Sequence, residues 1–208
     1  MRRTARTYAV PKLERIKIWD PVTRLWHWAL AAAVITNWIF GEFMSFDTVT
    51  WHFYLGYTVL VLLGFRLLWG FVGPAPVRWR SLLPRPSALI GYISNVGKRQ
   101  PSGTPGHNPL GSLSVIALLL VLAALAGTGL FIETDDFFES GPLYGYVSES
   151  TVNSLTWWHH FLSKVLLALV VLHLAAILFY RLWKREDLLK PMITGWKWVR
   201  SKSADHSD

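Results

Sequence analysis

The chain of 208 residues has 52% hydrophobic residues, 16% charged residues and a mean hydropathy of +0.31, values that are high for a soluble domain and ordinary for a small membrane protein. It contains no cysteine, which excludes disulfides, thiolate metal sites, iron–sulfur clusters and covalently attached c-type haem. The net charge of +8 would suggest nucleic-acid binding if it formed one surface patch, but the basic residues are sorted by loop, as in membrane proteins.

The first part of the chain predicts a polar tail and two membrane spans. Residues 1–20 are basic and lack the apolar core of a cleavable signal peptide, so we expect a cytoplasmic N-terminal tail that ends in a strand or turn. The Asp20-Pro21 pair predicts a helix start. The two spans, each with a histidine near its beginning, are about 22–40 with His27 and about 51–71 with His52.

The second part predicts two further spans separated by polar connections. Residues 74–111 are too polar to cross a membrane, and within them 86–98 predict a short amphipathic surface helix. An acidic loop covers 133–156, and a basic tail covers 184–208. The spans are about 112–132, which contains Gly127 and Gly129 but no ionisable residue, and about 157–180, which contains His159, His160 and His173.

The distribution of Lys and Arg predicts the orientation of these spans. Of the 21 basic residues, all except Lys164 lie in the N-terminal segment, the middle connection or the C-terminal tail, while the other two loops are acidic. Positive charge marks the cytoplasmic side. We therefore expect an all-α, multi-pass four-helix bundle at residues 21–183 in the bacterial cytoplasmic (inner) membrane, with both termini in the cytoplasm.

The histidines pair by depth across this predicted bundle. The 14-residue step from His159 to His173 returns to within roughly 40° of the same helix face, whereas the step from His160 leaves the two rings roughly 140° apart. His159 and His173 are also about 21 Å apart along the axis. His27 should lie level with His173 towards the cytoplasm, and His52 level with His159 towards the outside.

Two such pairs indicate two flat metal macrocycles, because facing imidazoles bind one iron from both sides and leave it no open position for substrate. Zinc would need three or four ligands at one point, which the 21 Å separation does not provide. The alternative is that the histidines are structural. We prefer that structural interpretation for His160 and for His107 in the middle connection, and the paired-ligand interpretation for the other four.

The chain resembles the bacterial cytochrome b561 and nickel-hydrogenase cytochrome b family from about residue 16 to 197. The motifs that carry the resemblance are WDPVTRLWHW, the span-two stretch from WHFYLGY to WGFVGP, GHNPLG, the TWWHHF and VLHLAA pair, and YRLWKREDLLKPMITG. The resemblance implies two non-covalent b haems ligated by His27, His52, His159 and His173. It also implies electron transfer between a quinone pool and a partner such as a c-type cytochrome or a hydrogenase.

Haem propionates are anions, so cations near the expected haems are candidate contacts for a propionate or a quinone. These cations are Arg24, Arg66 and Lys164. Arg24 and Arg66 could equally be cytoplasmic anchors, and Lys164 could reach outward to the membrane surface.

Other functions stay open on the sequence alone. A membrane enzyme could act on a small redox species at the outer haem with quinone as co-substrate, and a non-redox transporter or scaffold would make the histidines incidental. A homo-oligomer is compatible with the chain. A nucleotide site is not indicated, because the sequence has no dinucleotide fingerprint or phosphate loop.

Overall fold

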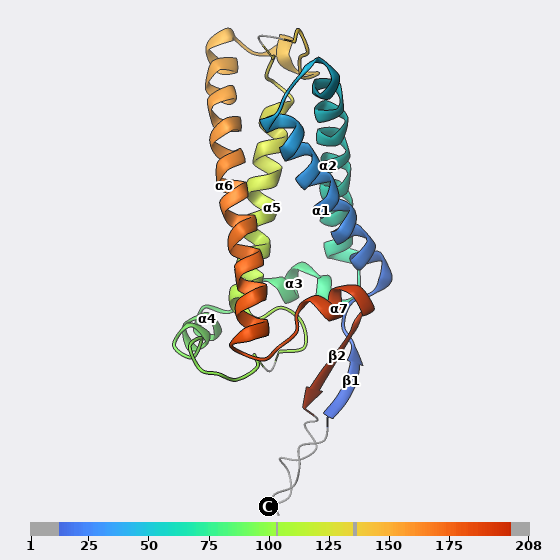
Figure 1. The fold of residues 1–208 in the computed structure, drawn as a ribbon, viewed down its shortest axis with the longest axis vertical. Helices are drawn as coiled ribbons and strands as arrows, with labels where there is room; N and C mark the ends of the chain where they lie inside the picture. The colour runs from blue at the N-terminus through green and yellow to red at the C-terminus, as the bar shows by residue number, and fades with distance from the viewer. Residues whose placement is uncertain (1–12, 103, 135–136, 201–208) are drawn as a thin grey trace, which may run out of the picture.

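The computed structural model describes residues 13–102, 104–134 and 137–200, and its long axis follows four helices that lie side by side (Figure 1). Helix α1 packs on α2, α2 packs on α5, and α5 packs on α6. The four helices are α1 (Pro21–Glu42), α2 (Phe46–Val72), α5 (Pro109–Gly129) and α6 (Glu149–Leu182).

Short side chains fix where two of these helices begin. Asp20 caps α1 by accepting a hydrogen bond from the Thr23 amide at 3.0 Å, with Pro21 at the first helical position. Asn108 caps α5 in the same way, accepting from the Gly111 amide at 2.9 Å. A proline at this position loses only an amide that the helix would leave unpaired. The Asp-Pro and Asn-Pro pairs therefore set both starts locally.

Helix α6 begins at Glu149, eight residues before the predicted start of span four at Trp157. Its first two turns are polar, so hydropathy alone does not detect them. A polar helical end can lie beyond the hydrocarbon layer, where backbone and side chains remain hydrated. The predicted surface helix is correspondingly shorter than expected, because α4 covers only Pro86–Ile93.

Within the described part of the chain, three helices are long and apolar enough to cross a membrane: α2, α5 and α6. Together they support a multi-pass membrane protein. Helix α1 is 22 residues long but carries Arg24, His27 and Asn37, which make it less apolar than the others. That α1 also crosses the membrane stays a prediction.

The four helices share a small core at mid-height. Ala33, Val59, Leu122 and Leu166, one from each helix, pack together and are buried. Many large apolar side chains point outward instead, among them Leu172 and Leu174 on α6. An outward apolar surface of this kind is what contact with lipid requires.

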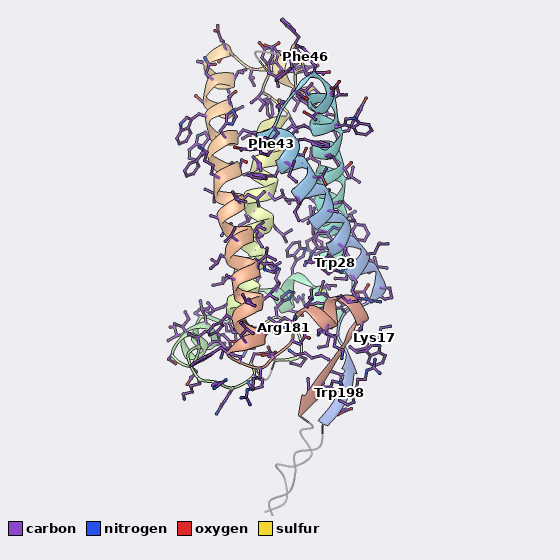
Figure 2. All side chains as sticks on the ribbon, in the orientation of Figure 1. Lys17, Trp28, Phe43, Phe46, Arg181 and Trp198 are labelled. Carbon is purple, nitrogen blue, oxygen red and sulfur yellow. The ribbon has the colours of Figure 1, made fainter. Side chains whose placement is uncertain are left out.

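The two ends of the molecule differ in structure and charge. The connection 43–45 and the described residues 130–134 and 137–148 lie at one end, here called the acidic end, and neither connection contains Lys or Arg. The opposite, basic end carries a two-stranded antiparallel ribbon and three short helices, and Figure 2 labels Phe46 at the acidic end and Lys17 and Trp198 at the basic end. The short elements there are β1 (Leu13–Lys17), α3 (Trp79–Leu82), α4, α7 (Leu189–Thr194) and β2 (Trp196–Arg200).

Candidate cofactor site

His52 of α2 and His159 of α6 face each other towards the acidic end. Their ring centroids are 6.3 Å apart and the ring planes are inclined by 75°. Two imidazoles that bind one metal ion from opposite sides have ring centroids about 6 Å apart. That distance is the sum of two metal–nitrogen bonds of about 2 Å and roughly 1 Å from each nitrogen to its ring centre. The two rings therefore lie at a distance that suits a single metal ion between them.

Each of these two rings is held by its Nδ1 atom. Nδ1 of His52 donates a hydrogen bond to the backbone carbonyl of Asn37 at 3.0 Å. Nδ1 of His159 lies 3.1 Å from the carbonyl of Leu125 and 3.0 Å from the hydroxyl of Thr128. A carbonyl only accepts, so the proton is on Nδ1 and the Nε2 lone pair is left to bind. Metal-ligating histidines are oriented by this same kind of outer contact.

Glycines lie against both rings. A Cβ atom at Gly41 would be 2.9 Å from Cε1 of His52, and one at Gly129 would be 3.3 Å from Cε1 of His159. The backbone thus approaches each imidazole where any side chain would displace it. Gly127, predicted together with Gly129, has no such neighbour and faces open space.

His27 of α1 and His173 of α6 form the second pair, towards the basic end. Both are partly buried and close enough to interact electrostatically. Nδ1 of His27 is buried without a hydrogen-bond partner among the described residues. Because α6 runs unbroken through both His159 and His173, the two pairs are about 21 Å apart along that helix.

Two predicted cations lie at the basic end with unused donors. Arg66 is 6% exposed, donates from Nη2 to the Val77 carbonyl at 3.0 Å, and leaves Nη1 buried without a partner. Its guanidinium also lies 4.4 Å from the Trp79 ring centroid. Arg24 donates to the Ile193 carbonyl, and its Nε is buried without a partner. Such unpaired buried donors fit an anionic group beside them.

Lys164 and His160 are both exposed on α6. Lys164 makes no hydrogen bond or ion pair with any residue in the described ranges. Among the described residues, the ring of His160 has one aromatic neighbour, His159, at a centroid distance of 6.3 Å.

His107 is a residue whose position the sequence did not reveal. Its ring packs on Trp19 with centroids 4.8 Å apart, and it is close enough to His27, His173 and Arg66 to feel their charge. Burial, followed by these positive neighbours, lowers the pKa of His107 from 6.5 to about 4. The available signal was the GHNPLG motif, in which Asn108 and Pro109 fix the start of α5 directly after His107.

No three His, Asp or Glu side chains among residues 13–102, 104–134 and 137–200 converge on a possible metal position. His52 and His159 instead meet as a facing pair between the long helices, and His27 and His173 lie close enough to interact electrostatically nearer the basic end. This arrangement fits a flat metal macrocycle at each level better than it fits a multi-ligand zinc centre. The class of protein it defines is a multi-pass membrane cytochrome.

The sequence model of prokaryotic cytochrome b561 matches residues 18–195, and the chain belongs to this family. The family resemblance expected from the motifs is therefore confirmed. The chain is 24% identical to a probable Ni/Fe-hydrogenase B-type cytochrome subunit of Azotobacter vinelandii, with 94% of each chain covered. It is 25% identical to the Rhizobium leguminosarum bv. viciae protein of that description (88% of each covered) and 22% identical to the probable Ni/Fe-hydrogenase 1 B-type cytochrome subunit of Escherichia coli K12 (86% and 89%). Membership implies haem b and electron transfer.

Proposed function

We propose that the protein transfers electrons across the bacterial cytoplasmic membrane through two b haems, each held by one pair of histidines. The observation that carries this proposal is the facing pair His52 and His159, with both Nδ1 atoms tied down and a ring separation that suits one metal ion. Each haem, when bound, would supply an iron that accepts and releases one electron.

Different residues of the chain would hold the two haems. His52 and His159 would hold the haem at the acidic end, and His27 and His173 would hold the haem at the basic end. Gly41 and Gly129 let the backbone lie close against the two rings of the first pair. Arg24 and Arg66 offer unpaired buried donors beside the second pair, where the carboxylates of a haem could accept them.

We further propose that one end exchanges electrons with quinone and the other with a redox partner protein. The relatives named as hydrogenase cytochrome subunits favour a hydrogenase as the partner, and a c-type cytochrome is the alternative. The acidic end, which carries Glu133 and Glu139 but no base, would suit a partner with a basic face. Loss of rapid haem reduction by such a partner at high salt would support this docking.

Haem content tests the central proposal. The purified protein should show a reduced-minus-oxidised spectrum of b-type haem with two haems per chain. His52→Ala or His159→Ala should leave one haem, as should His27→Ala or His173→Ala, because one imidazole no longer faces another across the iron.

His160→Ala is the matched control, since it removes an exposed imidazole from the same helix and should keep both haems. A colourless wild-type protein would end the proposal of electron transfer. Two haems in His159→Ala together with loss in His160→Ala would move the ligand assignment to His160.

A further inference from the structure

The basic end holds buried positive charge without a matching acid. Within the described part of the chain, the ion pair of Lys197 with Glu186, at 2.6 Å, is the only one, so neither Arg24 nor Arg66 has a carboxylate within reach. Each also has a buried N–H group without an acceptor. Leaving a buried donor without an acceptor destabilises the fold, and more so when the donor is charged. A bound anion would supply both the missing hydrogen-bond acceptors and the missing negative charge.

His107 faces the same place from another element. Its ring packs on Trp19 with centroids 4.8 Å apart, and it lies close enough to interact with charged groups on α2 (Arg66), α6 (His173), α1 (His27) and β2 (Lys197). The His107 side chain is exposed, and neither ring nitrogen hydrogen-bonds to a described residue. His107 thus has an unused N–H donor and lies close enough to His27 and His173 to interact with their charges.

The loop that carries His107 is fixed on both sides. The amide and hydroxyl of Ser102 donate to the Glu186 carboxylate at 2.6 and 2.7 Å. Lys197 bridges the same carboxylate and the Thr104 carbonyl, the latter at 2.8 Å. On the other side Asn108 caps α5. A loop anchored on both sides of His107 limits where the ring can lie, which favours a preorganised contact.

We propose that His107, Arg24 and Arg66 form a carboxylate-binding site that receives the propionates of the haem held by His27 and His173. The site rests on the proposed function, because it needs a haem at that position. It adds His107 as a positioning residue that touches the carboxylates and not the iron. No three histidine or acidic side chains of the described residues converge, so His107 does not form a multi-ligand metal site with His27 and His173.

The test is the midpoint potential of each haem in the intact, detergent-purified protein, measured by spectroelectrochemical titration. His107→Leu keeps the packing on Trp19 but removes the N–H donor. A less neutralised propionate stabilises the ferric iron, so reduction of one haem should become about tenfold less favourable, a fall of about 59 mV for one electron. The other potential, the haem content and the low-spin spectrum should not change.

Three further measurements make the result specific. His160→Leu, an equal change at an exposed site of α6, should move neither potential, and His107→Asn, which keeps a donor, should restore most of the shift. In a His173→Ala background, which retains only the haem at the acidic end, His107→Leu should have no effect.

Reconstitution with haem whose propionates are esterified shows which anion occupies the site. The two candidates are the haem propionates and a free or lipid phosphate. The difference between wild type and His107→Leu should vanish with the ester if the propionates are bound, and persist if the occupant is a free or lipid phosphate, which would overturn the proposal. Unchanged potentials in His107→Leu with full haem content would also overturn it. A wild-type protein without haem would instead refute the proposed function.

Discussion

Gly41 and Gly129 show how single atoms define the first histidine pair. Both lie where an added methyl group would meet Cε1 of a histidine, at 2.9 and 3.3 Å respectively. Contacts this short force the imidazole or the backbone to move. The tie from each Nδ1 atom to a backbone carbonyl limits how far the ring can shift without losing its hydrogen bond. Ring orientation at this level is thus set by glycine on one side and a carbonyl on the other.

We expect Gly129→Ala to weaken haem retention at the acidic end, and Gly41→Ala to weaken it more, because its methyl would be closer. Overpacking of this kind typically costs about 1–3 kcal/mol. The measurement is haem per chain after a detergent wash, read with the spectrum. Gly127→Ala is the matched control on α5, since it meets nothing within 4 Å and should retain both haems. Equal haem loss in the control would mean that the glycines act through the helix and not through the rings.

Helical periodicity was sufficient to place His159 and His173 on one face of α6, because both residues belong to one element. It could not supply the partners of the histidine rings. The carbonyl of Asn37 beside His52, the hydroxyl of Thr128 beside His159 and the ring of Trp19 beside His107 come from other elements, and their positions follow from tertiary packing. For this reason His107 was interpreted as a structural residue, although the structure places it beside the second pair.

At the scale of elements, the basic end is held together by contacts between distant segments. Strand β1 pairs with β2 in an antiparallel register that joins Ile16 to Lys197. Lys197 in turn binds Glu186, and Glu186 binds Ser102. The N-terminal segment, the middle connection and the C-terminal segment are therefore joined through one buried carboxylate, which is 6% exposed.

This carboxylate should make the basic end sensitive to acid. Burial alone raises the pKa of Glu186, but the hydrogen bonds from Lys197 and Ser102 outweigh it and hold the pKa below its usual value of 4.5. The folded state then binds fewer protons than the unfolded state. Its contribution to stability is present in full above about pH 4.5 and is lost as the pH falls below that value.

We expect Glu186→Gln to loosen residues 102–108 at neutral pH by roughly 3–5 kcal/mol, since it leaves Lys197 buried without its partner. Hydrogen exchange of this segment, followed from pH 7 to pH 3, measures the effect. The variant should exchange fast throughout, while the wild type should become fast only in acid. Glu14→Gln, at an exposed carboxylate of β1, is the control and should match the wild type. Protection that is independent of pH in the wild type would contradict this role of Glu186.

Element boundaries were predictable where their causes are local. The caps at Asp20 and Asn108 act within three residues, so the starts of α1 and α5 follow from short motifs. The polar start of α6 at Glu149 has no such motif and no apolar pattern. Pairing of β1 with β2 joins residues that are far apart in sequence, and no local preference determines it.

At the scale of the whole molecule, the clearest feature is the separation of charge between the ends. The sequence predicted this separation from loop composition, and the structure gathers the basic connections at one end and the acidic ones at the other (Figure 1). Three helices support a membrane position, but whether α1 crosses with them depends on which sides its two ends face.

The absence of native cysteine allows a direct test of this topology. Phe46→Cys, just after α1, should react with a membrane-impermeant thiol reagent added to intact spheroplasts, in which the outer face of the cytoplasmic membrane is accessible. Lys17→Cys, just before α1, should react only after the membrane is broken. Both positions are exposed and lie at opposite ends of the molecule (Figure 2). Labelling of both from the same side would show that α1 does not cross and would leave the three-span arrangement.

Helix α6 supplies one histidine to each pair and runs unbroken from Glu149 to Leu182. The spacing of the two sites is therefore a property of the α-helix itself, 14 residues at about 1.5 Å each, and not of any loop. Loops at either end can lengthen, or change their charge to suit a new partner, without altering that interval. A single inserted residue between His159 and His173 would turn one ring about 100° away from its mate. Helix α6 thus fixes the distance between the two histidine pairs. The surfaces at the two ends that contact partners can change in sequence while this distance stays the same.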